Sequence, residues 1–513
     1  MFGVAASRLC THRRLRGAFF TLVFTTLWTL FFPACRSAPE IEEPTAPPVT
    51  GVVHLDTALT VAFEAADEPR RSEIYVEVAG GLAASGTVAD AIAVLENVRV
   101  VDIDTALLLS RGWNEVAAAD EEYVLNAFRA DEDVLAYTAD LDDPNDRAAS
   151  LLRLLSIQLD NENRSFESIR AVIDELYFIP DDAIRAVSLV DAAERIRRSG
   201  ERVALTAVVQ QAIAILPSIE DPFLAATMSA RLADLSLTID RPQDTESLLT
   251  GAVTRAEAGL FVAEATVDDL QRLAEILTRL RGAEAAAAVA ENVTPRAYRA
   301  LTYANIAAAL PVGEIAGRYF EDALARAAEI ADADRRVRTQ TAVILIRSEA
   351  RPDWSPEDSI AETLQRADLP TQSPEFRLEV LTGMGTAYYL SGRPEGLDRL
   401  RGLIASSGEL SALRVSIAEA LVARGRTDDA TAILQLIEPS PETLIGFSTR
   451  PALAAADLLR RLDGWDRSVQ LLASATAAGI VSAPEAAVIL ARIPADYRPN
   501  PVSRGQLERI LEE

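Results

Sequence analysis

Few residue types in this chain could carry chemistry. The 513 residues include 50 basic residues, all of them arginine, together with two histidines and two cysteines. Without lysine the chain cannot form a Schiff base or a lysine-dependent phosphate loop, and so few His and Cys exclude a multi-histidine metal site and a cysteine-rich zinc site. Carboxylates, arginines and one histidine outside the N-terminal segment remain as candidates.

That histidine is His54, which Val52, Val53 and Leu55 flank. A catalytic histidine requires a nucleophile on one side of its ring and an orienting acid on the other. Nothing in this stretch supplies them. We predict a surface or first-turn histidine, which argues against Ser–His and Cys–His hydrolases.

Acidic residues are densest in the segment Asp140–Asp146. A loop rich in oxygen ligands can bind a hard cation, but an EF-hand needs Gly and Glu at its sixth and twelfth positions. Counted from Asp140, those positions hold Asn145 and Leu151. We therefore predict a solvated loop that caps the next helix, and we interpret Asp120–Glu122 and Asp131–Asp133 as acidic helix starts, which suit the helix dipole.

Arginines cluster twice, and each cluster could bind an anion. We predict instead that both place cations at a helix C-terminus, which requires no ligand. The first cluster surrounds Gly200, and the second lies in the 335–338 segment: Arg195, Arg197, Arg198 and Arg202; Arg335, Arg336 and Arg338.

A glycan-cleaving enzyme would need paired carboxylates. The Glu246-Ser247 pair of the kind found in soluble lytic transglycosylases is present, but it lies in a helical pattern and no Gly-Leu-Met-Gln stretch follows. Trp113, Trp354 and Trp465 are scattered, as expected of packing residues, although one could serve as an exposed binding anchor. The sequence thus predicts no catalytic, metal or cofactor-binding residue.

The N-terminus has the composition of a targeting segment. Four arginines precede Gly17–Phe32, which carries no charge. As a helix this stretch would span roughly 24 Å, less than the roughly 30 Å of a bilayer core but suited to a signal-peptide apolar region.

The four residues Phe32-Pro33-Ala34-Cys35 that follow resemble the lipobox of bacterial lipoproteins. Ala34 fits that pattern, whereas Phe32 replaces the usual Leu and Pro33 is uncommon there. The resemblance implies cleavage before Cys35 and lipidation of Cys35, while Cys10 is discarded. An uncleaved anchor helix and ordinary secretion are the alternatives.

From Leu55 onward the apolar spacing is helical, with residues at i, i+3 and i+4. Pro and Gly fall mainly between the periodic stretches. The first such face comprises Leu55, Ala58, Leu59, Ala62, Phe63 and Ala66. We predict an all-α fold.

Helical patterns also repeat in pairs around turn residues. The predicted turns are Gly86, Gly200, Gly282, Gly392, Gly425 and Asp463, with Pro217 and Pro439 closing two of the second helices. Ala316, Phe320 and Ala323 indicate a further second helix.

These pairs, with small residues where helices touch, resemble the tetratricopeptide (TPR) repeat. The turn marks from Gly200 to Asp463, which include Pro311 and Arg351-Pro352, lie about 38 residues apart on average, against about 34 in that family, so the repeats are degenerate. We predict an α-solenoid of about eleven to thirteen helix pairs, with a HEAT-like or other α-solenoid, and then a compact bundle, as alternatives. Ser503 and Gln506 form a capping-box pattern, which predicts a terminal helix covering the exposed end of the last repeat.

The predicted organisation has three parts: a lipoprotein signal peptide over residues 1–34, a Pro/Glu-rich tether over 35–51, and a TPR-like array with its C-terminal capping helix over 52–513. A net charge of −27 argues against nucleic-acid binding and favours partners with basic segments.

We expect a non-catalytic protein-binding scaffold that is lipid-anchored in the bacterial cell envelope, most plausibly at the periplasmic face of the outer membrane. It would bind other envelope proteins through the concave face of the array. The alternatives are an all-α glycan-active hydrolase or lyase and a structural envelope spacer. A deep pocket with two facing carboxylates would favour the enzyme, and a shallow continuous groove would favour the scaffold.

Overall fold

The chain forms two units, Met1–Ala46 and Pro47–Glu513. The computed structural model describes residues 46–161, 166–258, 267–291, 293, 296–404, 406–437 and 448–512. The predicted signal peptide, Cys35 and most of the predicted tether therefore lie outside the described residues. Within the described residues there are 25 α-helices and no strand, which confirms the all-α prediction.

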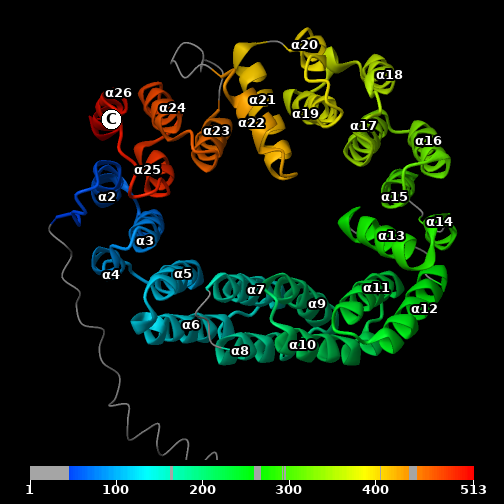
Figure 1. The fold of residues 1–513 in the computed structure, drawn as a ribbon, viewed down its shortest axis with the longest axis horizontal. Coiled ribbons are helices and arrows are strands. Elements are labelled where there is room, and N and C mark those ends of the chain that lie inside the picture. The colour runs from blue at the N-terminus through cyan, green and yellow to red at the C-terminus, as the bar shows by residue number, and fades with distance from the viewer. Residues whose placement is uncertain are drawn as a thin grey trace, which may run out of the picture. The chain divides into compact units, whose positions relative to one another are not determined.

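In the second unit the helices alternate between an inner and an outer row (Figure 1). Each inner helix packs against the next inner helix along the chain. The inner row consists of α3 (Glu68–Ala84), α5 (Ile103–Ala119), α7 (Pro144–Asp160), α9 (Asp182–Ser199), α11 (Pro222–Thr238), α13 (Val267–Arg281), α15 (Arg296–Ala309), α17 (Ala333–Ala350), α19 (Pro374–Leu390), α21 (Ser407–Val422), α23 (Thr449–Arg461) and α25 (Ala483–Ala491).

The outer row supplies the second helix of each pair, and α2 (Val53–Ala65) precedes the first pair. The outer helices are α4 (Val88–Leu95), α6 (Val124–Ala139), α8 (Phe166–Tyr177), α10 (Arg202–Ile215), α12 (Pro242–Ala258), α14 (Ala283–Glu291), α16 (Glu314–Ala328), α18 (Glu357–Ala367), α20 (Gly396–Arg401), α22 (Thr427–Leu434), α24 (Trp465–Ala477) and α26 (Pro501–Glu512). Short 3-10 helices lie at Glu121–Tyr123, Leu216–Ser218 and Leu369–Thr371.

The predicted turns between paired helices are confirmed. Gly200 ends α9 with a φ of 81°, a left-handed conformation that glycine adopts without steric cost. Asp463 makes the equivalent turn after α23 with a φ of 58°. Pro217 lies in the 3-10 helix that ends α10, as predicted, and Pro439 lies outside the described residues.

Small residues lie where helices cross. A Cβ atom at Gly385 of α19 would come within 2.3 Å of Ile417 in α21, and one at Gly112 of α5 would come within 2.6 Å of Leu95 in α4. Neighbouring backbones therefore approach closely at positions that a larger residue would block.

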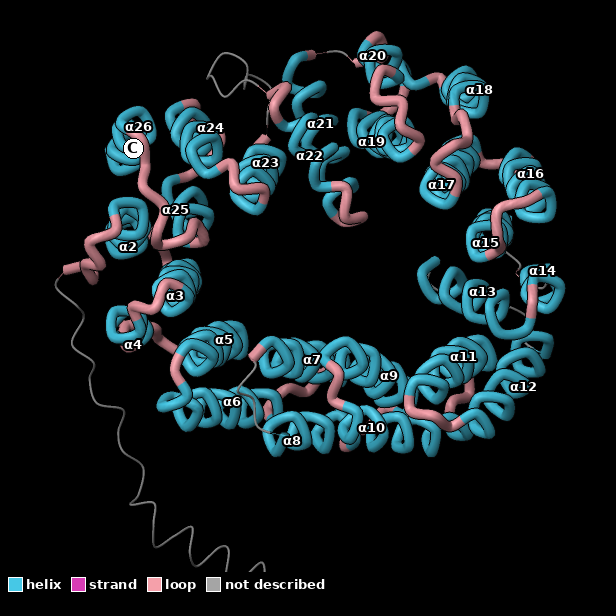
Figure 2. The backbone as a smooth tube through the Cα atoms, in the orientation of Figure 1, coloured by secondary structure: helices cyan, strands magenta, loops and turns pink. Residues whose placement is uncertain are grey.

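The two ends of this unit pack together, so its array closes on itself (Figures 1 and 2). Helix α2 packs against α25 and α26, and α3 packs against α25. Because α2 packs against α26, the last helix pair has no exposed end for a capping helix to protect. The predicted capping box is also wrong: Asn500 caps α26 by accepting the Ser503 N–H at 2.8 Å, and the Ser503 hydroxyl donates to Asp466.

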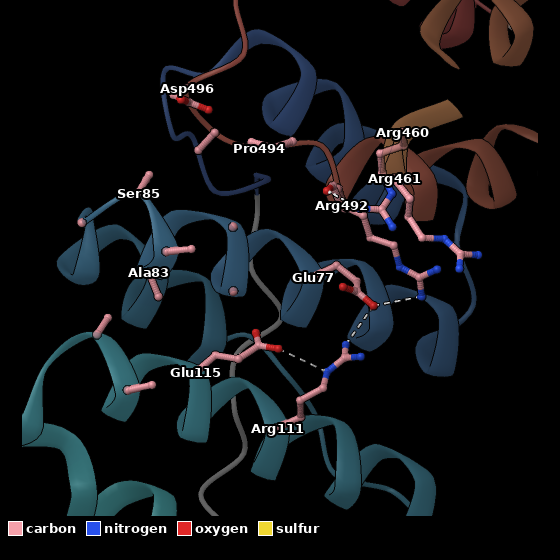
Figure 3. Close-up of a pocket in the computed structure, with 18 of the residues that line it drawn as sticks. Glu77, Ala83, Ser85, Arg111, Glu115, Arg460, Arg461, Arg492, Pro494 and Asp496 are labelled. Carbon is pink, nitrogen blue, oxygen red and sulfur yellow. Dashed lines mark hydrogen bonds and ion pairs between the residues drawn. The ribbon is translucent and has the colours of Figure 1, made fainter. Parts of the chain in front are cut away.

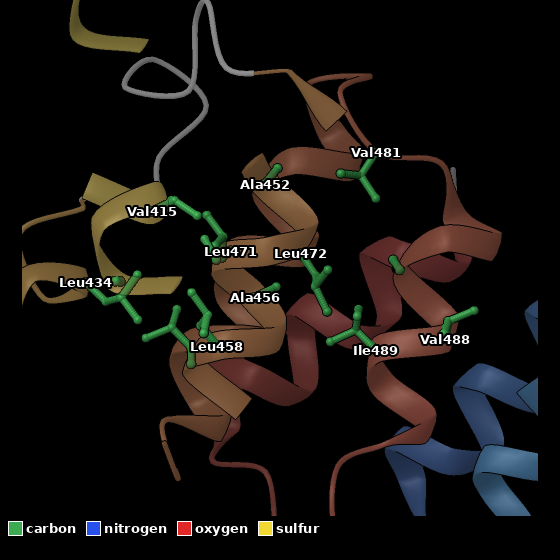
Figure 4. Close-up of a cluster of buried hydrophobic side chains, with 14 of the residues drawn as sticks. Val415, Leu434, Ala452, Ala456, Leu458, Leu471, Leu472, Val481, Val488 and Ile489 are labelled. Carbon is green, nitrogen blue, oxygen red and sulfur yellow. The ribbon is translucent and has the colours of Figure 1, made fainter. Parts of the chain in front are cut away.

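The apolar core forms two clusters of buried side chains. One combines residues 55–116 with residues 337–510 and therefore spans the closure, and the other covers residues 106–343. Figure 4 shows Ala456 of α23, Leu472 of α24 and Ile489 of α25 within the first cluster. No helix in the described part of the chain is both long enough and apolar enough to cross a membrane.

Candidate functional site

His54 is a structural residue at the closure. It lies in the first turn of α2, as predicted, but it is fully buried, so the alternative of a surface position is wrong. Its Nε2 donates to the carbonyl of Ile493 over 3.2 Å, and its ring meets that of Tyr497 edge-on. Burial lowers the pKa of His54 to about 4 because the charged imidazolium would lose its hydration.

Two of the three acidic segments act as predicted. Asp143 caps α7 by accepting the Asn145 N–H, and Asp120 accepts the Glu122 N–H at the start of the 3-10 helix before α6. Among the described residues, no group of three or more His, Cys, Asp or Glu side chains is arranged to hold a metal ion.

The third segment was misinterpreted, because Asp131 lies in the middle of α6 and is buried. Its carboxylate accepts hydrogen bonds from Ser110 and Asn114 of α5 and from Gln158 of α7. Burial raises the pKa of Asp131. Asp131 therefore joins three helices, which its local sequence did not indicate.

The first arginine cluster follows the prediction in part: Arg197 and Arg198 lie in the last turn of α9, whereas Arg202 is the first residue of α10. Arg197 also pairs with Asp234 of α11 at 2.9 Å. The second cluster does not: residues 335–338 lie at the start of α17, directly after its cap Asp332. Arg338 reaches Glu379 of α19 at 2.9 Å. The cap at Asp332 was the sequence signal that could have located this helix start.

The remaining candidates have packing or surface roles. Glu246 lies in α12 and pairs with Arg281 at 2.8 Å. The three tryptophans are half-buried and pack against the first apolar cluster, as predicted for packing residues. Arg347, for example, lies over the Trp354 ring at 4.3 Å.

A cavity of about 1190 Å³ lies where the two ends of the array meet (Figure 3). Its walls come from α3 and α5 on one side and from α23, α25 and residues 494–496 on the other. The charged lining residues are Glu77, Arg111, Glu115, Asp457, Arg460, Arg461, Arg492 and Asp496. The sequence did not indicate this cavity, because most of the chain separates its two sides.

Two carboxylates in the cavity each bridge two guanidinium groups. Glu77 accepts from Arg111 and Arg492, each at 2.9 Å (Figure 3). Asp457 pairs with Arg460 at 2.9 Å and with Arg461 at 2.5 Å. Burial would raise the pKa of Asp457, but Arg460 and Arg461 lower it below its ordinary value.

Glu115 has a different environment. Its nearest cation is Nε of Arg111 at 3.8 Å, beyond hydrogen-bond distance. One of its oxygens lies where a side chain at Gly80 would be, since a Cβ there would be 1.9 Å from Oε2. Although the side chain is 41% exposed, its carboxyl group lies against α3 at Gly80 and is partly desolvated there. This desolvation raises the pKa of Glu115 to about 7, which Arg111 partly opposes and Glu77 reinforces.

The cavity therefore contains two glutamates of unlike character, and Arg111 contacts both (Figure 3). Glu77 is bridged by two guanidinium groups, whereas Glu115 has no hydrogen-bonded cation and a pKa raised to about 7. Unlike carboxyl groups of this kind can act as an acid–base pair. Here, however, the Glu77 carboxylate already forms ion pairs with Arg111 and Arg492, so it is not free to accept a proton from a substrate.

No protein-family model and no curated protein matches the chain. The lipoprotein and TPR-like resemblances therefore stay predictions that rest on the motifs in the sequence.

Proposed function

We propose that this chain is a lipid-anchored, exported scaffold of the bacterial cell envelope that binds other proteins and catalyses no reaction. Lipidation of Cys35 would hold it at a membrane, with the periplasmic face of the outer membrane as the favoured location. The observation that carries the proposal is the unbroken inner row from α3 to α25, which forms one extended surface from the first helix of every pair.

The inner row has the charged side chains that recognition of a protein requires. Exposed ion pairs connect successive inner helices, such as Arg153 of α7 with Asp104 of α5 and Arg338 of α17 with Glu379 of α19. Exposed pairs of this kind contribute little to stability, about 1 kcal/mol or less. Their charges can therefore be exchanged for those of a partner at small cost. With a net charge of −27, the favoured partner surface is basic.

The first test concerns anchoring. In a Gram-negative host fed an alkyne analogue of palmitate, the wild-type chain should be labelled and the Cys35→Ala variant should not. Cys10→Ala is the matched control and should label like the wild type, because Cys10 precedes the cleavage site. Labelling of Cys35→Ala at the wild-type level would contradict the anchor.

The second test concerns partner binding. A chemically crosslinked pulldown from detergent-solubilised envelope should recover a specific protein with the wild-type chain. Glu379→Arg, which reverses a charge on the inner row, should reduce that recovery, whereas Asp90→Arg on α4 of the outer row should not. Recovery of no specific partner by the wild-type chain would contradict the scaffold.

An all-α glycan-active enzyme is the second candidate, and the pKa of Glu115, about 7, is the observation that favours it. The discriminating assay is release of reducing ends from purified peptidoglycan at pH 7. Turnover by the wild-type chain that Glu115→Gln abolishes would establish the enzyme. We expect no turnover by either protein, because two arginines occupy Glu77.

A further inference from the structure

The cavity where the two ends of the array meet, which we call the closure cavity, has charged groups that differ in how they are paired. All four of its arginines have a carboxylate partner: Arg111 and Arg492 pair with Glu77, and Arg460 and Arg461 pair with Asp457. An incoming anion would therefore have to displace a carboxylate that is already in place. The arginines are poor candidates for the ligand-binding groups of this cavity.

The carboxylates of the cavity differ from the arginines, because two of them have no close ion-pair partner. Glu115 has only the 3.8 Å contact to Arg111, and Asp496, which is exposed at the cavity rim, forms no ion pair with another described residue. Four inner helices also end at the cavity: α3 at Ala84, α5 at Ala119, α23 at Arg461 and α25 at Ala491. Helix C-termini carry partial negative charge. The formal charges that line the cavity balance, four arginines against four carboxylates, but Glu115 and Asp496 are the carboxylates without a close cation.

The wall beside Glu115 leaves room for a ligand. It consists of residues with little or no side chain, namely Gly80, Gly81, Ala83, Ala84, Ala118 and Ala119. An aliphatic stem can lie along such a wall while its charged end reaches a carboxylate. Because Gly80 has no side chain, the Glu115 carboxyl group can lie against α3 at that position.

We propose that the closure cavity binds a cationic side chain, an arginine or a lysine on the basic segment of a protein partner, with its charged end at the Glu115 carboxylate and its stem along the Gly80–Ala84 wall. This inference rests on the proposed function, since it names the group through which a partner would engage the scaffold.

Binding at this site would also stabilise the closure. The wall from α3 and α5 and the wall from α23 and α25 meet only when the array is closed. A ligand that needs both walls binds the closed form alone and shifts the equilibrium towards it.

The test uses the full chain in a non-ionic detergent and isothermal titration calorimetry at pH 7. The probe is the capped tripeptide acetyl-Gly-Arg-Gly-amide, and its control carries citrulline, which has nearly the same shape without the charge. The arginine peptide should bind at least about tenfold more tightly than the citrulline peptide, because the ion pair forms in a partly desolvated site.

Proton release gives an independent readout. A cation next to Glu115 favours its ionised form, so binding at pH 7 should release part of a proton. Titrations in two buffers with different ionisation enthalpies measure that release. Glu115→Gln should abolish the release and weaken binding at least about tenfold, whereas Glu419→Gln, an exposed position on α21, should change neither.

Equal affinity for the two peptides would overturn the inference, as would tighter binding of acetyl-Gly-Asp-Gly-amide, which would make the cavity an anion site. If the arginine peptide fails to bind while the pulldown recovers a partner, only the cavity inference fails. If the peptide binds with proton release but no partner is recovered, the scaffold proposal fails and the cationic site remains.

Discussion

The α9–α11 and α3–α25 contacts both join neighbouring inner helices, but different interactions stabilise them. At the α9–α11 contact the chain continues through α10, and Arg231, which is 5% exposed, pairs with Glu194 at 2.9 Å and with Asp191 at 2.5 Å. At the α3–α25 contact the two helices are separated in sequence by almost the whole second unit. Arg492, which is 29% exposed, pairs there with Glu77 next to a cavity.

The difference lies in where each contact obtains its stability. The α9–α11 contact depends on the buried Arg231, whose guanidinium group would be left uncompensated without Glu194 and Asp191. The closure depends on the apolar face of α2, with Leu55 and Leu59 fully buried, and on the neutral ring of His54. The closure should therefore open without unfolding of the central helices, and its stability should respond to pH.

The largest expected effect is on the α9–α11 contact. Arg231→Ala removes the partner that Asp191 and Glu194 share, and Glu194 keeps only the less buried Arg272, so the free energy of unfolding should fall by about 3 kcal/mol. Urea unfolding followed by circular dichroism measures the change. Arg153→Ala, at an exposed pair, is the control and should cost about 1 kcal/mol or less. Equal losses in the two variants would remove the distinction between the contacts.

A substitution that removes a buried side chain of α2 should weaken the closure selectively. Leu59→Ala removes a fully buried side chain and should destabilise the closure by about 2–5 kcal/mol. Hydrogen exchange followed by mass spectrometry should then show faster exchange in α2, α3 and α25, with α9 and α11 unchanged. Leu189→Ala, a similar cavity within α9, should produce the opposite distribution. Exchange that rises over all helices in both variants would mean that the closure does not open separately.

Acidification should also weaken the closure, through His54. Its pKa in the folded chain, about 4, lies below its ordinary 6.5, so the open state binds the proton more readily. This stability is fully present above pH 6.5 and is lost as the pH falls towards 4, by about 3 kcal/mol in all. Hydrogen exchange in α2 at pH 7 and pH 4.5 measures the loss. His54→Gln, which can still donate to Ile493, should show a smaller loss, and an unchanged pH dependence would exclude His54 as its cause.

The smallest effect has the opposite sign and belongs to Glu115. Its folded-state pKa, about 7, lies above its ordinary 4.5, so the protein loses stability as the pH rises from 4.5 to 7. Glu115→Gln should therefore be slightly more stable than the wild type at pH 8 and equal to it at pH 4.5, as measured by thermal unfolding. Glu419→Gln is the control. A variant less stable than the wild type at pH 8 would contradict this environment for Glu115.

The sequence predicted much of the local structure. Turns at Gly200 and Asp463 and the cap at Asp143 were identified because each depends on a backbone conformation or a hydrogen bond within a few residues. Asp131 and the 335–338 arginines were misplaced, although both are also local features. Acidic residues occur at helix starts and within helices alike, so charge alone does not locate a helix boundary.

The sequence by itself determined the all-α fold, the pairing of helices and the scarcity of catalytic residue types, because helical periodicity, turn conformation and composition are properties of short stretches or of the whole count. Only the tertiary structure decided that the array closes. His54 and Ile493, which are 439 residues apart, meet there, and Glu77 and Glu115 come to face Arg492 and Asp457 in one cavity. Closure depends on a small rotation between neighbouring helix pairs that accumulates around the array, and no short stretch of sequence reveals that sum.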